Sequence, residues 1–300
     1  MAIRYLEQKY IDYTKWDRCI NTSLNSEIYV SSMYLDTVAG SWDAIIENNY
    51  ETVMPLVHTK KFMIKTIYQH PLIKYLGVFS GSPVRSDKID LFLKAIPDKF
   101  RKIDMCLNLQ NTQALKGTFS SYRNLYELDL IIPYAKKVKS YPVKVKKALD
   151  SAMKRRLIIL KNTSVLEFRN LLHQNPGRIS EKLVISPLMR VLSKLIPLNK
   201  AEISGVYGPE NMLYAAACFI RSNQNVIMLF ARTLKEGIES YANYLLLDSF
   251  LRDYSGRNVT LSMEHIDHIW NDEFYNEFGA LKSYHYCYCK NRLPWQLKRF

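Results

Sequence analysis

The sequence predicts a mixed α/β fold divided into two domains. Apolar runs typical of strands alternate along the chain with segments that carry apolar residues at helical spacing. The chain has 300 residues, which is enough for two ordinary domains. Hydrophobic residues make up 48% and charged residues 23%, with only 10 Gly and 11 Pro. This composition is that of a globular protein, and it excludes a disordered or low-complexity chain.

The first half of the chain is predicted to consist of strands with interspersed helices. Two apolar runs, at 42–46 and 50–57, flank Asn48-Asn49 and indicate a hairpin, because Asn tolerates positive φ. Segment 86–96 carries its apolar residues on one helical face and is stopped by Pro97, so a helix is expected there. Further strands are expected at 75–79, 103–107 and 125–130.

The second half has a clear order of elements. It predicts two helices, a three-stranded meander, a long helix, a strand, a short helix and a final strand. This is the order found in a GNAT acyltransferase domain, and the first half shows a looser version of it, so two such domains in tandem are expected. The predicted elements are the helices 165–173 and 186–196, the strands 202–207, 213–220 and 225–231, the helix 233–256, the strand 258–263, the helix 272–278 and the strand 283–290.

The predicted boundaries place an N-terminal GNAT-like domain at 1–142 and a C-terminal one at 161–300. Segment 143–160 is expected to form a connecting helix with a basic face. Such a face is either a solvated surface or a surface for an anionic substrate, and the sequence leaves both interpretations open. The residues of this basic surface are Lys144, Lys147, Lys154 and Arg155.

The net charge of the chain is +14, from 42 Lys and Arg against 28 Asp and Glu. It indicates an anionic partner such as a nucleotide, a nucleic acid, a lipid head group or an acidic substrate, although excess Lys also serves solubility. The five cysteines show no framework spacing, which favours a reduced, cytoplasmic setting. No secretion signal is visible, and the apolar run 212–220 is too short to span a bilayer, so membrane contact is expected to be peripheral at most.

A site for an anionic donor is predicted where the strand 225–231 leads into a helix. Thr233 and Glu236 have capping-box spacing, and unpaired amides at a helix start attract anions. Arg232 and Lys235 add positive charge, and Gly237 permits close backbone approach. Arg232, Thr233, Lys235 and Gly237 are therefore the candidate donor-phosphate residues, and a capped structural helix without a ligand is the alternative.

No metal site is predicted, although His285, Cys287 and Cys289 alternate in the last expected strand, downstream of His265 and His268. Alternate strand residues lie roughly 6.8 Å apart, whereas the ligands of one tetrahedral zinc must converge within about 4 Å. We therefore expect these side chains to share a buried face rather than to bind zinc.

Several enzyme classes lack their motifs in this chain. There is no G-x-S-x-G elbow, no Walker A sequence and no dinucleotide fingerprint, which argues against a covalent hydrolase, an ATPase and a dehydrogenase. Direct transfer from a bound acyl donor needs none of these. The candidate catalytic residues are Glu264, as proton acceptor for an attacking amine, and Tyr275, as proton donor to the leaving group.

The chain also resembles the Fem-like tandem GNAT proteins of Bacteroidetes, the relatives that carry the label of methicillin-resistance proteins. The resemblance covers nearly the whole chain, and the order of its parts is more specific than any one part. The segments that carry it are Trp42–Glu47, Tyr50–Leu56, Tyr68–Pro71, Leu76–Ser80, Tyr126–Leu130, Lys144–Ala148, Ala215–Phe219 and Phe274–Ala280.

The resemblance implies a twin GNAT fold and transfer of an acyl or aminoacyl group, from acyl-CoA or aminoacyl-tRNA, to an amine. The better-known Fem enzymes use aminoacyl-tRNA to build peptidoglycan cross-bridges. Segment 261–266 departs from the family's pattern and keeps only Leu261 and Glu264. The alternatives are therefore a GNAT-fold binding protein without activity, or a basic module that binds RNA or a membrane surface. The sequence does not identify the acyl group, the acceptor amine or the oligomeric state.

Overall fold

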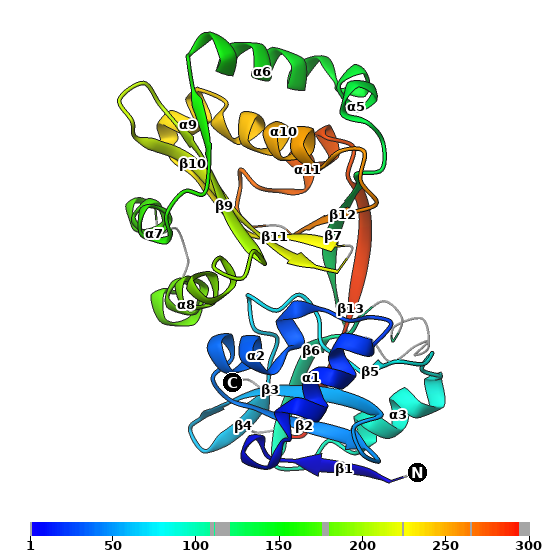
Figure 1. Cartoon of the computed structure of the whole chain (residues 1–300). Coiled ribbons are helices and arrows are strands. Elements are labelled where there is room, and N and C mark those ends of the chain that lie inside the picture. Colours follow the sequence, from blue (N-terminus) through cyan, green and yellow to red (C-terminus); the bar gives the residue numbers. More distant parts are fainter. Residues whose placement is uncertain are drawn as a thin grey trace. The chain divides into compact units, whose positions relative to one another are not determined.

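The computed structural model describes residues 2–108, 111, 121–175, 180–223, 225–264 and 266–293. The chain forms two compact units (Figure 1). Unit 1 takes residues 1–123 and 284–300, and unit 2 takes residues 124–283. The division therefore falls at 123/124 instead of the expected 142, and the C-terminal segment belongs to the first unit. The reason is that strand β13 (Leu281–Asn291) runs on from unit 2 and pairs with β6 of unit 1.

Unit 1 is built on a sheet with the strand order β1-β2-β3-β4-β6-β13, with β5 paired to β3. The last partner in this sheet is the C-terminal half of β13. Its other elements are β1 (Ile3–Leu6), η1 (Gln8–Tyr10), α1 (Tyr13–Thr22), η2 (Ile28–Val30), α2 (Ser32–Val38), β2 (Trp42–Glu47), β3 (Thr52–Lys61), β4 (Ile64–Ile67), β5 (Phe79–Ser80), α3 (Ser86–Lys94) and β6 (Phe100–Cys106).

The predicted hairpin is present as β2 and β3, which pair antiparallel. Its turn uses positive φ at Asn48 (48°) and Tyr50 (66°). The strand expected at 75–79 is wrong over most of its length, because Gly77 adopts a φ of 116° and only Phe79 and Ser80 pair with β3. In the core of this unit Trp16 of α1 contacts Trp42 of β2, with ring centroids 4.8 Å apart and both side chains fully buried.

Unit 2 is built on a sheet with the strand order β7-β12-β11-β10-β9-β8. The predicted meander is confirmed, because β9, β10 and β11 pair antiparallel in sequence. The elements are β7 (Ser121–Asp129), α5 (Tyr134–Ser140), α6 (Val143–Lys154), β8 (Ile158–Lys161), α7 (Val165–Gln174), η3 (Glu181–Ile185), α8 (Ser186–Leu195), β9 (Ala201–Tyr207), β10 (Leu213–Ser222), β11 (Asn225–Thr233), α9 (Lys235–Glu239), α10 (Ala242–Tyr254), β12 (Thr260–Met263) and α11 (Asp272–Glu277).

The core of unit 2 lies between its sheet and α10. Alternate residues of a strand point to opposite faces, and Ala215, Ala217 and Phe219 of β10 join the cluster that includes α10. Phe219 stacks on Phe250 of α10, with ring centroids 4.2 Å apart. Helices α7 and α8 cover the other face of this sheet (Figure 1). The small side chains of Ala215 and Ala217 leave room for the aromatic side chains of α10.

The expected connecting helix 143–160 is corrected by the structure. Helix α6 ends at Lys154, Arg156 adopts a φ of 56°, and β8 follows and pairs with β9. The apolar face of α6, with Val145 and Ala152 fully buried, belongs to the same core as α10. It is therefore a packed helix of unit 2 and not a linker.

One cysteine expectation also fails. The five cysteines were expected to be reduced, but Cys106 of β6 and Cys287 of β13 form a disulfide, with their Cα atoms 3.9 Å apart. The two residues are 181 positions apart in sequence, so no local spacing pattern predicts the pair. The structure has no helix, in the part of the chain that it describes, that is long and apolar enough to cross a bilayer.

Candidate functional site

Strands β11 and β12 of unit 2 pair only at their beginnings and then diverge. Their parallel ladder joins Asn225–Ile227 to Thr260–Ser262. Beyond it, β11 continues to Thr233 along β10, whereas β12 ends at Met263. Ligands of α/β folds bind beyond the carboxyl ends of parallel strands, where neighbouring strands separate. The residues around this divergence are therefore the first candidates for a site.

The chain that follows β12 folds back onto the C-terminal end of β11. Asp267 Oδ1 accepts hydrogen bonds from the backbone N–H groups of Ile269 (2.8 Å) and Trp270 (2.9 Å), which forms a tight turn. Trp270 is fully buried, and its indole Nε1 donates to Thr233 Oγ1 at 3.0 Å. This turn packs against the end of β11.

Arg232, at the end of β11, is engaged within the same turn. Its guanidinium donates from Nη1 to Asp267 Oδ2 at 2.7 Å, and the residue is only 4% exposed. Burial lowers the pKa of Arg232, and the nearby Asp267 carboxylate opposes that shift. Arg232 and Thr233 thus have internal partners and hold the turn after β12.

A helix begins after β11, as expected, but the predicted capping box is absent. The N-cap of α9 is Leu234 and has no side-chain cap. The N–H of Leu234 donates to the carbonyl of Tyr214 on β10 at 2.8 Å, and a Cβ on Gly237 would lie 2.5 Å from the same oxygen. Gly237 is therefore required by packing against β10. Lys235 is exposed and faces Glu239 at 3.9 Å.

The long helix expected at 233–256 is divided into α9 and α10. The break lies at Tyr241, the N-cap of α10, which adopts the left-handed conformation with a φ of 61°. A non-glycine residue in this conformation costs about 1–2 kcal/mol. Strain of this kind occurs at functional sites more often than elsewhere, and the side chain of Tyr241 lines a pocket.

The two predicted catalytic residues lie next to each other. Tyr275 of α11 donates from its hydroxyl to the backbone carbonyl of Glu264 at 2.9 Å. Burial raises the pKa of Tyr275 well above its usual value, because the side chain is fully buried. Glu264 is partly buried and directly follows β12. The contact runs through the backbone, so Tyr275 fixes the position of Glu264.

A pocket of about 260 Å³ lies between the α9–α10 break and α11; its lining includes Phe274, next to Tyr275 in sequence, but neither Tyr275 nor Glu264. Its charges come from Lys144 of α6 and from two carboxylates of α11. Lys144 Nζ lies 2.5 Å from Glu277 Oε1 and 3.5 Å from Glu273 Oε1. The hydrogen bond to Glu277 raises the pKa of Lys144. The lining residues are Lys144, Ile238, Tyr241, Asn243, Tyr244, His268, Ile269, Asn271, Glu273, Phe274 and Glu277.

The predicted basic surface is exposed along α6, but only some of its residues form ion pairs. Lys144 is neutralised by Glu273 and Glu277 of α11. Lys147, Lys154 and Arg155 are exposed, and they have no ion pair within the described ranges. Because Lys144 also lines the pocket, the three free cations continue from the pocket along one helix.

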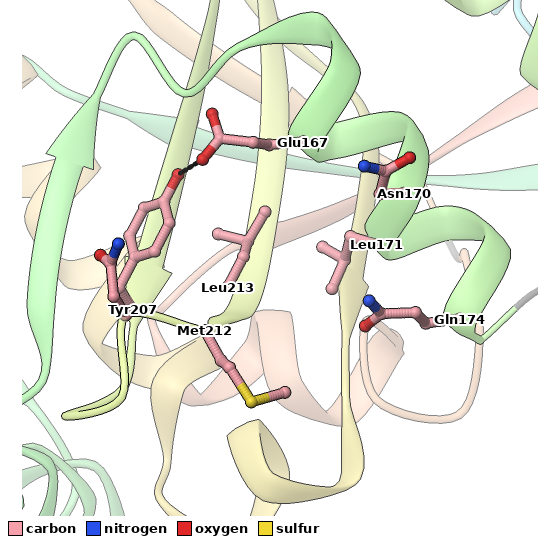
Figure 2. A pocket seen from close by; sticks show the side chains of 8 residues that line it. Glu167, Asn170, Leu171, Gln174, Tyr207, Met212 and Leu213 are labelled. Atoms are coloured by element: carbon pink, nitrogen blue, oxygen red, sulfur yellow. Dashed lines mark hydrogen bonds between the residues drawn. The ribbon is translucent and has the colours of Figure 1, made fainter.

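A second pocket of unit 2, of about 190 Å³, lies between α7 and the β9–β10 turn (Figure 2). Its carboxylate, Glu167, accepts from the N–H of Ser164 (3.1 Å) in a capping box. Tyr207 donates from its hydroxyl to the other oxygen of Glu167 at 3.1 Å (Figure 2). The hydrogen bonds from Ser164 lower the pKa of Glu167. This carboxylate is used to start α7, so we do not place the reaction here.

The histidine and cysteine residues near the C-terminus lie on one buried side of β13, as expected. His285 and Cys287 are each 2% exposed, and Cys289 is half-buried. Cys287 is joined to Cys106 by the disulfide. Across the described ranges, no group of three His, Cys, Asp or Glu side chains is arranged to hold a metal ion. His265 lies outside the described residues.

Comparison with known proteins identifies the fold. A solved structure of FemX matches with a TM-score of 0.66 and covers 100% of both chains, at 12% sequence identity. The chain has the FemX fold. The structure of a conserved protein from Bacteroides thetaiotaomicron also matches, with a TM-score of 0.59 and 9% identity, over 96% of this chain and 100% of that one. L-PGS from Bacillus licheniformis has a TM-score of 0.56 and 11% identity, over 94% and 93% of the two chains.

The FemX fold confirms the predicted mixed α/β class and the resemblance to Fem-like proteins at the level of architecture. No family model and no curated protein matches the sequence. At identities of 9–12% the likeness extends to the fold and not to the site.

Sequence reasoning missed the turn after β12 and the two carboxylates of the pocket. The partners Arg232 and Asp267 are 35 residues apart, so no local pattern links them. A signal did exist for α11, because Asn271 is followed three residues later by Phe274, whose N–H it caps at 3.0 Å. That cap fixes the start of the helix that presents Glu273 and Glu277.

Proposed function

We propose that this chain is an N-acyltransferase of the Fem type that takes its acyl group from aminoacyl-tRNA. The observation that supports this proposal most is the charged pocket between the α9–α10 break and α11, where Glu273 and Glu277 lie with Lys144. The FemX fold supports the reaction class, and an amine is the proposed acceptor. A cytoplasmic location would follow, because aminoacyl-tRNA is made there.

The charges in the pocket favour an aminoacyl donor over acyl-CoA. An aminoacyl ester carries a cationic α-amine, which suits the net negative charge that Glu273 and Glu277 leave after pairing with Lys144. The pyrophosphate of CoA would meet those same carboxylates. Arg232, the cation expected to bind it, is 4% exposed and paired with Asp267. Helix α9 has only five residues, and the N–H of its N-cap, Leu234, is bonded to the carbonyl of Tyr214 on β10.

The cations of α6 extend this argument to the rest of the donor. Lys147 and Lys154 are exposed on the helix whose Lys144 reaches the pocket, and the exposed Arg155 is the C-cap of that helix. A nucleic acid bound with its 3′ ester in the pocket would place its phosphates along α6. Such contacts release counterions, so the affinity should depend steeply on salt.

The proposed reaction needs positioning and one proton acceptor. The acceptor amine attacks the ester carbonyl carbon, a C–N bond forms and the ester C–O bond breaks. Glu264 accepts the proton that the amine loses and passes it to the ribose oxygen, which leaves as a hydroxyl group. Tyr275, through its 2.9 Å hydrogen bond to the backbone of Glu264, holds that carboxylate in place. The high pKa of Tyr275 keeps its hydroxyl protonated for this purpose.

Binding of tRNA to these three cations is tested by filter binding of tRNA charged with mixed amino acids, across a salt series. The triple variant Lys147→Ala, Lys154→Ala, Arg155→Ala should lower the slope of log K against log salt by about 3, roughly one per lost phosphate contact. The matched control changes three exposed lysines of unit 1, Lys60, Lys61 and Lys94, to Ala. If the slope of log K against log salt fell equally in both triple variants, a specific role of α6 in tRNA binding would be rejected.

The aminoacyl specificity is tested with Glu273→Gln. The side chain of Glu273 is 80% exposed, so the variant should fold normally. Wild type should bind charged tRNA about tenfold more tightly than uncharged tRNA, and the variant should lose most of that difference. If acetyl-CoA binds and charged tRNA does not, the donor assignment is wrong.

A second candidate function is binding without transfer. It is favoured by the turn after β12, because Trp270 and Asp267 bond to the end of β11, where the donor phosphate was expected to bind. A single-turnover assay decides between them, with charged tRNA and a panel of primary amines. Stable binding without amide product, together with an unaltered rate of ester hydrolysis, would establish the second function and reject the first.

A further inference from the structure

Unit 1 contains a cavity of about 420 Å³ that the proposed reaction does not use. It lies among α1, the β2–β3 turn, the segment after β5 and α3. Its lining combines cations with hydroxyl groups and has few apolar side chains. The residues are Lys15, Arg18, Cys19, Thr22, Asn49, Tyr50, Glu51, Thr52, Ser80, Gly81, Ser82 and Lys88.

Arg18 is the cation in this cavity that has no internal partner. Lys88 is paired with the buried Glu47, and Lys15 donates to Asn49 Oδ1 at 2.9 Å and lies 3.7 Å from Asp12. Arg18 is exposed, and within the described part of the chain its guanidinium makes no hydrogen bond or ion pair. A guanidinium presents parallel N–H donors that match phosphate oxygens.

The carboxylate that lines the cavity is already engaged. Glu51 accepts from the side-chain amide of Asn48 at 2.8 Å. Its charge therefore opposes an anion less than a free carboxylate would, and the cavity lining carries three cations to one anion.

The floor of the cavity supplies a neutral hydrogen-bond donor. Ser80 is 6% exposed, and its Oγ accepts from Thr52 Oγ1 at 3.4 Å and from the N–H of Ser82 at 3.3 Å. With both acceptor positions used, the hydroxyl proton of Ser80 is left to donate. The Thr22 hydroxyl instead donates to the carbonyl of Arg18 at 3.0 Å, so its oxygen remains an acceptor for a ligand hydroxyl.

We propose that this cavity binds a small phosphomonoester that also carries hydroxyl groups, with Arg18 on the phosphate and Ser80 donating to a ligand oxygen. A volume of about 420 Å³ accommodates a ligand the size of a sugar phosphate. The site lies wholly within unit 1, so it is independent of the donor pocket of unit 2 and of the function proposed for it.

Calorimetry with glucose 6-phosphate, inorganic phosphate, citrate and glucose tests the proposal on the intact chain. Glucose 6-phosphate should bind more tightly than inorganic phosphate, and glucose should not bind measurably. Arg18→Ala should weaken the binding of glucose 6-phosphate at least tenfold, and Ser80→Ala about fivefold, as expected for loss of one charged and one neutral hydrogen bond. The control Lys60→Ala, an exposed lysine elsewhere in unit 1, should leave the affinity unchanged.

Protection of Cys19 from alkylation tests whether the ligand binds in this cavity. Cys19 lines the cavity and is 6% exposed, whereas Cys218 is fully buried in unit 2. Burial raises the pKa of the Cys19 thiol to about 11, so its alkylation at pH 9 should be slow enough to follow by mass spectrometry. Glucose 6-phosphate should slow the modification of Cys19 and leave Cys218 unaffected. The proposal is overturned if no phosphomonoester binds below 10 mM, if Arg18→Ala binds as wild type, if citrate binds equally well, or if Cys19 is not protected.

Discussion

The buried pair of Arg232 and Asp267 gives the sharpest test of how the end of β11 is used. Arg232 is 4% exposed, and its Nη1 lies 2.7 Å from Asp267 Oδ2. Asp267→Ala would leave the guanidinium buried without its carboxylate and would remove two backbone hydrogen bonds to the turn. Loss of one partner of a buried pair costs about 3–5 kcal/mol. We expect the free energy of unfolding to fall by that amount.

Two further variants separate the charge from the turn. Asp267→Asn keeps an oxygen for the backbone N–H groups of Ile269 and Trp270, so it should cost only about 1.5–3 kcal/mol, the value of a charged hydrogen bond. Arg232→Met combined with Asp267→Asn should be more stable than Asp267→Ala, because no unpaired charge stays buried.

Urea denaturation followed by circular dichroism measures all of these variants on one scale. The control is Lys235→Ala, which breaks only the exposed pair with Glu239 and should stay within about 0.5 kcal/mol of wild type. A loss below 1 kcal/mol for Asp267→Ala would refute the structural role of the pair. Arg232 would then again be a candidate for binding donor phosphate.

Two other predictions concern packing and pH. Gly237→Ala should lower stability by about 1–3 kcal/mol in thermal melts, because its Cβ would lie 2.5 Å from the backbone oxygen of Tyr214 and 2.8 Å from Thr233 Cγ2; an unchanged melting temperature would contradict this. Burial, aided by Lys74, lowers the pKa of His285 from 6.5 to about 4. The unfolded chain therefore binds the proton first, and stability should fall as the pH drops from 6.5 to 4, by roughly 3 kcal/mol. His285→Leu should remove this dependence, and a parallel pH curve for the variant would contradict the assignment.

Local patterns were sufficient to predict most of the elements. The hairpin at Asn48, the meander of β9 to β11 and the helix α3 follow from turn residues and apolar periodicity, which act over a few positions. The division at Tyr241 was missed because a tyrosine in the left-handed conformation has no sequence signature. The strand expected at 75–79 failed because Gly77 breaks the extended backbone.

The site was predicted less well than the fold because its contacts are distant in sequence. Glu264 and Tyr275 were predicted and lie together, but their link is a backbone carbonyl that no side-chain pattern reveals. Arg232 was chosen for its charge, yet its charge is satisfied by Asp267 from another segment. A basic residue next to a strand end can serve a ligand or the protein itself, and only the tertiary partner distinguishes the two.

The return of β13 to unit 1 affects how this chain is made. Residues 287–291 are made after the whole of unit 2, yet the sheet of unit 1 needs them to cover the edge of β6. Unit 2, which is continuous from 124 to 283, has all of its residues available earlier. Unit 1 begins before unit 2 in the chain and is therefore completed after it, and until then β6 has an unpaired edge that can pair with strands of other chains.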